Sequence, residues 1–350
     1  MKPIKGRGSS DNPENRFEKV YLDYNLDEET GEKPAPGTQL LTDHTKDIIS
    51  KNNSPDIPFN KSINPYRGCE HGCIYCYARP SHEFLGMSAG LDFESKIVVK
   101  YKAAKLLRKT LSDKSWKPEP IVMSGVTDPY QPVERELRIT RSCIEVLLEA
   151  RHPLGLITKN HLVTRDIDLL SELAKMDAVK VAISITTLDP ELARVMEPRT
   201  SRPQRRLDAI RQLAEAGIPV RVNVAPIIPG LTDHESVSIL EEATRAGATG
   251  AGYTLLRLPY GVKELFVDWL GQHYPDRKSK VLNRILDVRN GKLNLSEFGE
   301  RFRGTGNYAD QIHDLFKHHT KRLGLHRESK PLSAEHFRRL NGDQLTLWCE

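Results

Sequence analysis

The chain lacks the features of membrane-spanning and disulfide-stapled proteins. Among its 350 residues, no apolar run approaches the roughly 18 residues that a membrane-spanning helix needs. The stretch from Met1 to Gly8 has no apolar signal region. Only five cysteines are present, and their clustering is not that of a disulfide framework. We therefore expect a cytoplasmic protein whose cysteines stay reduced.

Two further absences narrow the function. No Gly-x-Gly-x-x-Gly follows any candidate strand, which argues against a dinucleotide-binding fold. The 52 basic residues barely outnumber the 47 acidic ones, so the net charge is only +5. Between Lys317 and Arg339, seven basic residues outnumber two acidic ones, so this segment carries the whole excess. Such a segment fits either a polyanionic partner or a solvated tail.

Short β-rich runs alternate with helical patterns from about residue 61 to 260, which is typical of βα units around a parallel sheet. We expect strands at 62–68, 120–125, 154–158, 179–185, 220–225 and 252–256, and a further extended segment at 92–100. We expect helices at 102–112, 140–151, 164–175, 204–216 and 234–246, and then at 263–272, 276–289 and 308–323. The pattern alone does not separate an open sheet from a barrel.

Composition divides the chain into four parts. Residues 1–60 are rich in Pro, Asn, Asp, Ser and Gly and predict an extension that wraps the core or is partly disordered, with a short strand at 20–22. The βα units fill 61–260, and a helical region fills 261–325. Residues 326–350 look like a basic, flexible tail.

Polar and glycine-rich residues gather where the predicted strands end. They occur at 125–128, 158–159, 184–187 and 225–230. In parallel α/β folds the carboxyl ends of the strands meet on one face, and that face carries the functional loops. We therefore expect the site to be built from these four segments.

The strongest local pattern is Cys69-x3-Cys73-x2-Cys76, with Tyr75 just before the last cysteine. Clustered thiolates favour soft metals and iron–sulfur clusters. Three ligands are one short of a closed zinc site. Either a distant residue completes a zinc site, for which the candidates are Cys143, Cys349 and His71, or one metal position is left open.

This cysteine pattern, in front of a βα series, resembles that of the radical S-adenosylmethionine superfamily. The resemblance implies a partial (β/α)6 TIM-like barrel, with Cys69, Cys73 and Cys76 on three irons of a [4Fe–4S] cluster and Tyr75 near the adenine. S-adenosylmethionine chelates the fourth iron and is cleaved reductively to a 5′-deoxyadenosyl radical. It also implies an electron donor such as flavodoxin or ferredoxin.

More of the chain resembles the spore photoproduct lyase-like group, and the fullest match is to its uncharacterised PA0069-type subfamily. The matching segments are 6–8, 15–18, 64–69, 76–80, 82–86, 124–132, 186–190 and 228–233. This resemblance suggests a nucleic-acid lesion as substrate. One departure matters, because true spore photoproduct lyases carry a hydrogen-donor cysteine in the loop after the second strand. This chain has Ser124-Gly125-Val126-Thr127-Asp128 there, so the thymine-dimer activity is not carried over.

The superfamily resemblance also implies a cofactor pocket, and each part of it has a structural alternative. The matching positions are Ser124, Gly125, Thr127 and Asp128 for the amino group, Ser184 and Thr186 for the ribose or carboxylate, Ala225 and Ile227 for the adenine, and Arg199 for the carboxylate. The alternatives are ordinary turn chemistry, helix capping, core packing and a structural salt bridge, respectively. Cys143 falls inside a predicted helix, where a buried cysteine is usually inert.

The C-terminal pentapeptide Gln344–Trp348 resembles the motif with which bacterial repair and replication proteins dock on the sliding clamp. The alternative is a tail that packs on its own domain. Other functions stay open at this stage: radical modification of RNA or of a small metabolite, and a metal-binding module that acts through its tail without catalysis.

Overall fold

A seven-stranded, mostly parallel sheet forms the centre of the computed structural model, which describes residues 3–17, 37–326 and 330–340. Six parallel strands follow one another in the order β3 (Lys61–Ile63), β6 (Ile121–Met123), β7 (Leu154–Thr158), β8 (Val179–Ser184), β9 (Val220–Ile227) and β10 (Gly250–Leu255). The seventh strand, β2 (Ile49–Lys51), pairs antiparallel with β3 at the edge. This α/β arrangement agrees with the partial barrel expected from the sequence.

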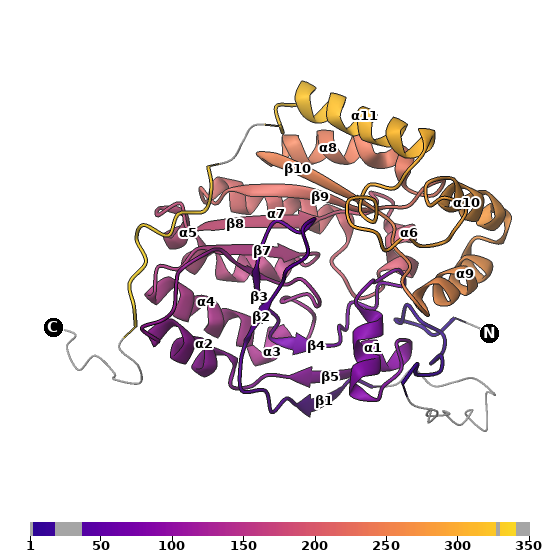
Figure 1. The fold of residues 1–350 in the computed structure, drawn as a ribbon. Helices are drawn as coiled ribbons and strands as arrows, with labels where there is room; N and C mark the ends of the chain where they lie inside the picture. The colour runs from indigo at the N-terminus through magenta and orange to yellow at the C-terminus, as the bar shows by residue number, and fades with distance from the viewer. Residues whose placement is uncertain (1–2, 18–36, 327–329, 341–350) are drawn as a thin grey trace.

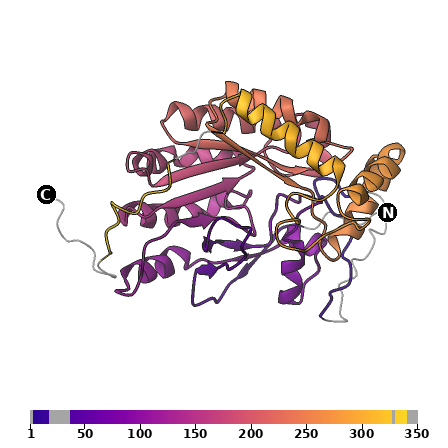
Figure 2. The same ribbon diagram turned by 45° about the horizontal axis from the view of Figure 1, so that its top comes forward.

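Helices connect the strands and cover one face of the curved sheet (Figures 1 and 2). They are α2 (Ala103–Ser112), α4 (Ile139–Glu149), α5 (Ile167–Ala174), α7 (Pro203–Glu215) and α8 (Ser236–Arg245), and the short η2 (His161–Asp166) precedes α5. Three shorter helices, α3 (Glu134–Leu137), α6 (Pro190–Met196) and η3 (Asp233–Glu235), lie in the connections. Each outer helix is amphipathic, as expected for a helix that packs one face on a sheet.

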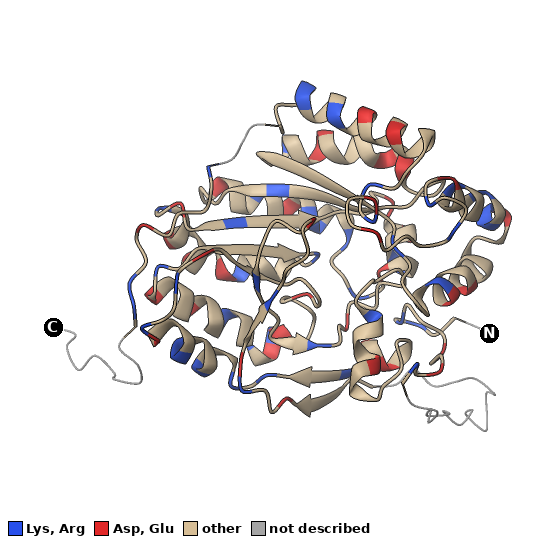
Figure 3. Cartoon of the chain, viewed as in Figure 1, with Lys and Arg blue, Asp and Glu red and all other residues tan. Residues whose placement is uncertain are grey.

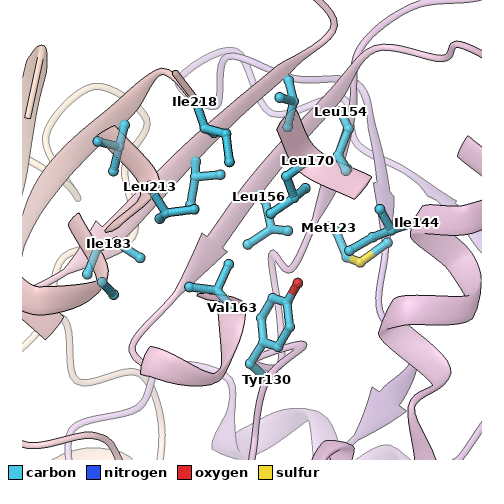
Figure 4. Close-up of a cluster of buried hydrophobic side chains, with 14 of the residues drawn as sticks. Met123, Tyr130, Ile144, Leu154, Leu156, Val163, Leu170, Ile183, Leu213 and Ile218 are labelled. Atoms are coloured by element: carbon cyan, nitrogen blue, oxygen red, sulfur yellow. The ribbon is translucent and has the colours of Figure 1, made fainter. Parts of the chain in front are cut away.

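The core lies between the sheet and these helices. Side chains from β7 and β8 interdigitate with side chains from α5 and α7 (Figure 4). Leu156 and Leu170 are 1% and 0% exposed. Full burial of such a side chain stabilises the fold by about 1.5–3 kcal/mol, so this layer holds the strand ends in place.

A second, three-stranded sheet lies beside the first and carries the cysteine-containing segment. Its order is β1 (Gln39–Thr42), β5 (Lys96–Val99) and β4 (Tyr66–Arg67). The helices η1 (Arg79–Leu85) and α1 (Leu91–Ser95) follow the cysteines. The prediction of an extended segment over 92–100 was therefore wrong in its first half. The α1 turn forms because Asp92 and Ser95 hydrogen-bond locally and to the N-terminal segment, which residue propensities do not reveal.

Three C-terminal helices complete the chain: α9 (Val262–His273), α10 (Pro275–Asp287) and α11 (Asn307–Arg322). The basic segment at 317–339 begins within α11. The first turn of this helix is acidic and its last turn is basic (Figure 3). This distribution suits the helix dipole. In the described parts of the chain, no helix is both long and apolar enough to cross a membrane.

Residues 330–340 lie against the end of the barrel opposite the strand carboxyl ends (Figure 1). The Arg338 backbone N–H donates to the Ala150 carbonyl, and Phe337 packs edge-on against His152. Leu340 is 5% exposed. The expected tail is therefore not free of the barrel over this stretch. The predicted strand at 20–22 and the pentapeptide 344–348 lie outside the described residues.

Candidate active site

The cysteine loop is held in shape by one buried arginine. Arg79, fully buried, donates from Nε to the Cys73 carbonyl at 3.0 Å and from Nη2 to the Gly72 carbonyl at 3.2 Å. Its Nη1 donates to the Ala89 and Gly90 carbonyls, and Nη2 also reaches Glu94 Oε1 at 2.5 Å. The planar guanidinium thus fixes the backbone on both sides of the loop.

The N-terminal segment closes over this loop. The Gly8 and Ser9 backbone N–H groups donate to the two oxygens of Glu94 at 2.9 and 2.8 Å. Gly8 lies so close to the loop that an added Cβ would sit 1.7 Å from the Gly72 carbonyl oxygen. Gly72 itself has φ +65°, a conformation that favours glycine. Both glycines are therefore required for the close approach of two backbones.

Of the three clustered thiols, Cys69 and Cys73 are buried and Cys76 is half-buried, and all three lie among apolar side chains. Burial raises the pKa of Cys69 and Cys73 well above the ordinary range, and it raises the pKa of Cys76 despite the nearby Arg79 charge. Thiolates in such surroundings are stable only beside compensating positive charge, which bound metal supplies. Within the described ranges, no three His, Cys, Asp or Glu side chains converge on a point where they could hold one metal ion.

Tyr75 points its hydroxyl into a buried polar network at the ends of β8 and β9. It donates to Glu197 Oε1 and lies 3.2 Å from Thr186 Oγ1. Thr186 is 2.8 Å from the same carboxylate oxygen and 3.2 Å from the Ala225 carbonyl. Three residues expected at the cofactor pocket, Tyr75, Thr186 and Ala225, are therefore brought together.

Two cations balance the charge of Glu197. Arg206, 1% exposed, pairs with Glu197 and donates to the Ser184 carbonyl at 3.1 Å. Lys159 Nζ lies 3.3 Å from Glu197 Oε1 and donates to the Ala225 carbonyl at 2.8 Å. Burial alone would raise the pKa of Glu197, but the charges of Arg206 and Lys159 outweigh it and the pKa is lowered. The carboxylate is ionised and holds Tyr75 in one orientation.

Asp128 anchors the loop after β6 to the end of β7. It accepts from Thr158 Oγ1 at 2.7 Å and from the Lys159 backbone N–H at 2.8 Å, and its Oδ2 lies 3.4 Å from His71 Nδ1. Burial would raise the pKa of Asp128, but the charge of His71 and these hydrogen bonds lower it. The side chain that we expected to meet the cofactor's ammonium group is thus already engaged within the protein.

The rest of the loop after β6 has an unusual backbone. Ser124 and Gly125 have consecutive positive φ angles of 112° and 114°. Such angles are uncommon for serine and cluster at functional sites. Thr127 donates to the Tyr66 carbonyl at 2.9 Å, and Tyr77 donates to the Gly125 carbonyl at 2.5 Å. Contacts on both sides therefore impose this conformation.

The remaining predicted positions are more structural. Ser184 lies in the last position of β8 and is 6% exposed. Ile227 is fully buried in the main core, and Arg199 pairs with Glu70 at 3.0 Å. Cys143 is buried in α4, as the sequence predicted, and burial and the charge of Glu134 raise its pKa to about 12. Cys349 lies outside the described residues.

Sequence reasoning missed Glu197 and Arg206 as parts of the site and did not assign Lys159 a role. A role for Lys159 could have been predicted, because this residue directly follows β7 at the strand end. Glu197 and Arg206 carried no such signal. They lie at the end of α6 and within α7, where charged residues are usually solvated.

The fold and this site define an α/β protein with a buried three-cysteine loop at the carboxyl ends of its parallel strands. Residues 63–243 match the family model described as the radical SAM superfamily. This match covers half of the chain, and the chain belongs to the radical S-adenosylmethionine superfamily of enzymes. A [4Fe–4S] cluster and S-adenosylmethionine are the cofactors typical of that superfamily, and its enzymes need an electron donor.

The chain is also similar to other proteins and to solved structures. The chain is 38% identical over 230 residues to the uncharacterized protein Rv2578c of Mycobacterium tuberculosis, covering 65% of this chain and 68% of the relative. It is 30% identical over 223 residues to the uncharacterized protein MJ0683 of Methanocaldococcus jannaschii, covering 63% and 79%. Spore photoproduct lyase complexed with dinucleoside spore photoproduct superposes with a TM-score of 0.54 at 17% identity, covering 81% of this chain and 79% of that one. This last likeness concerns the fold alone.

Proposed function

We propose that Cys69, Cys73 and Cys76 hold a [4Fe–4S] cluster and that the enzyme cleaves S-adenosylmethionine reductively. The observation that carries this proposal is the loop itself, which brings two buried thiols and one half-buried thiol together at the carboxyl ends of the barrel strands and is held by Arg79. Three protein ligands leave one metal position for the cofactor. Bound together, the cluster and S-adenosylmethionine supply a 5′-deoxyadenosyl radical that abstracts a hydrogen atom.

The protein's own residues position the cofactor in this proposal. We assign its contacts to the loop Ser124–Asp128, whose main chain is held open by Tyr77 and Thr127, and to the wall formed by Tyr75, Thr186 and Ala225. Ser184 completes the wall through the end of β8. We also propose contacts from Arg199, which pairs with Glu70, and from Ile227, which packs in the core.

For the substrate we propose a damaged or modified base in nucleic acid. The fold of spore photoproduct lyase and the motif resemblance to that lyase-like group and its PA0069-type subfamily support this class. The loop after β6 contains no cysteine, so the hydrogen donor differs from that of the true lyases. We therefore do not assign thymine-dimer cleavage.

Anaerobic reconstitution tests the radical chemistry. We expect about four irons and four sulfides per chain, and 5′-deoxyadenosine after reduction in the presence of S-adenosylmethionine. Cys73→Ala should lose both, whereas Cys143→Ala, a change in the core cysteine, should retain the cluster. One tightly bound zinc with no deoxyadenosine would refute the proposal.

The proposed function also includes two protein partners. An electron donor such as flavodoxin or ferredoxin would reduce the cluster. The pentapeptide Gln344–Trp348 would bind the sliding clamp and bring the enzyme to DNA. A titration of the clamp with a peptide of residues 340–350 tests the second idea, and no binding would reject it.

A further inference from the structure

A groove of about 550 Å³ opens directly beside the cysteine loop. Its lining includes Arg16, Phe17, Tyr77, Phe84, Val126 and Tyr260. The four aromatic side chains are between 50% and 73% exposed. Large aromatic rings are usually buried, so four exposed rings around one groove mark a binding surface.

The rings come from separate parts of the chain and form a layered arrangement. Phe17, from the N-terminal segment, stacks on Phe84 of η1 with ring centroids 5.0 Å apart and planes inclined by 30°. The guanidinium of Arg16 lies 5.0 Å from the Phe17 ring and 3.6 Å from the ring of Tyr260. A surface of alternating ring faces and a guanidinium plane is suited to stacking planar ligands.

The groove is continuous with the proposed radical site. Tyr77 directly follows Cys76, and its hydroxyl donates to the Gly125 carbonyl in the loop assigned to the cofactor. Val126, 42% exposed, lines the groove from that same loop. A ligand held on these rings would therefore border the cofactor on one side.

Arginine side chains near the groove favour an anion. Arg16 is paired with Glu83, and Arg301 is paired with Asp56. Arg257 lies 5.5 Å from the Tyr77 ring, and among the described residues its buried Nε–H has no hydrogen-bond acceptor and no carboxylate pairs with it. Arg257 therefore brings a positive charge next to the ring of Tyr77, which lines the groove, on a side chain whose donor needs a partner.

We infer that this groove binds an unpaired stretch of DNA, with bases stacked on Phe84, Tyr260 and their neighbours and a phosphate reaching Arg257. The inference rests on the proposed function, since an enzyme that acts on a base must first take it out of the helical stack. Rings with exposed faces hold unstacked bases without sequence preference, and arginine adds cation–π and phosphate contacts.

Fluorescence anisotropy with the reconstituted full chain tests the inference. The probes are a labelled single-stranded DNA of mixed sequence, the same strand in a duplex, and its RNA counterpart. We expect the single strand to bind at least about tenfold more tightly than the duplex. Phe84→Ala and Tyr260→Ala should each weaken binding by about tenfold, whereas Phe84→Trp should retain it. Tyr101→Ala removes a ring that is 51% exposed outside the groove and should bind like the wild type.

The outcomes separate this inference from the proposed function. If the wild type binds the single strand and the two alanine variants bind equally well, the groove is refuted and a nucleic-acid substrate stands. If deoxyadenosine forms but neither DNA nor RNA binds at low salt, the nucleic-acid substrate and the groove both fail. Tighter binding of RNA than of DNA overturns the assignment to DNA. A wild-type dimer that Phe84→Ala dissociates would show that the groove is covered by a second copy. Iron content and melting temperature confirm that each variant is folded.

Discussion

At the scale of single residues, the site depends on a few buried charges whose partners fix them completely. Glu197 sits between Arg206 and Lys159, and it receives the Tyr75 hydroxyl. Each charge alone would be costly to bury, but together they are compensated. The group therefore turns a tyrosine beside the cysteines into a rigid wall. We expect its value to the enzyme to be orientation, since apolar side chains of equal volume would serve stability at least as well.

Glu197→Gln tests this compensation. The change keeps the shape of the side chain but leaves Arg206 and Lys159 without their carboxylate. We expect the free energy of unfolding, measured with urea, to fall by about 3–5 kcal/mol. Glu191→Gln, in the same helix but with a side chain that is 72% exposed, should change it by less than about 0.5 kcal/mol. Equal effects of the two changes would show that the buried charge is dispensable.

His152 gives the molecule a second residue-scale property, a pH dependence of stability. Its Nε2 accepts from the Trp116 indole N–H at 3.3 Å, so this nitrogen is unprotonated, and Nδ1 lies 3.1 Å from the Pro153 carbonyl. Burial lowers the pKa of His152 to about 4, and it lowers the pKa of His82 to about 4 as well. Between pH 6.5 and 4 the unfolded chain binds protons that the folded chain does not. Stability is therefore fully present above pH 6.5 and falls as the pH drops through this window.

We expect each histidine to contribute a loss of roughly 3 kcal/mol across that window. His152→Gln retains an acceptor for Trp116 but does not titrate, so it should remove the part of the pH dependence that His152 contributes. Urea unfolding at pH 7.5, 6.5, 5.5 and 4.5 measures it. A variant with the same slope as the wild type would contradict the assignment.

At the scale of elements, the sequence pattern predicts those strands and helices whose formation depends on local interactions. The strand at 154–158 is observed with the same bounds, and the outer helices agree within a few residues, because their hydrophobic periodicity reports their burial. The α1 turn was missed because its polar groups are satisfied by the N-terminal segment, far away in sequence. The cysteine loop could be predicted from the spacing of its residues. Glu197 and Arg206 could not be predicted, because they become part of the site only when the fold pairs them.

The N-terminal segment offers an element-scale test through Gly8. Gly8→Ala places a methyl group against the Gly72 carbonyl and should push the segment off Glu94. We expect a loss of about 1–3 kcal/mol in the free energy of unfolding, together with lower iron retention after reconstitution. Gly37→Ala is the matched control, since an added methyl group there meets nothing within 4 Å. Unchanged stability and iron content in Gly8→Ala would show that the segment is not a brace of the loop.

At the scale of the whole molecule, contacts cross every boundary that composition suggested. Asp56 in the N-terminal part pairs with Arg301 in the C-terminal part. Arg289, fully buried, donates to the Leu255 and Leu256 carbonyls at the end of β10. Composition marks where a chain changes character, but it carries no information on which distant carboxylates and carbonyls will be met. The parts at 1–60, 61–260 and 261–325 are therefore joined by polar contacts as well as by the chain, half-buried at Asp56 and fully buried at Arg289.

These contacts predict that the C-terminal helices do not unfold separately from the barrel. Trp269 of α9 is 2% exposed and donates to the Val195 carbonyl at 3.1 Å, so its fluorescence reports the junction between the helices and the barrel. In a chain carrying Trp116→Phe and Trp348→Phe, the urea midpoint from fluorescence should coincide with the midpoint from far-ultraviolet circular dichroism. A fluorescence change at lower urea would mean that α9 and α10 form an independent unit. In that case the contacts of Arg289 and Arg301 would not couple the unfolding of the helices to that of the barrel. Coincident midpoints would mean that these contacts belong to the same cooperative structure that holds the cysteine loop.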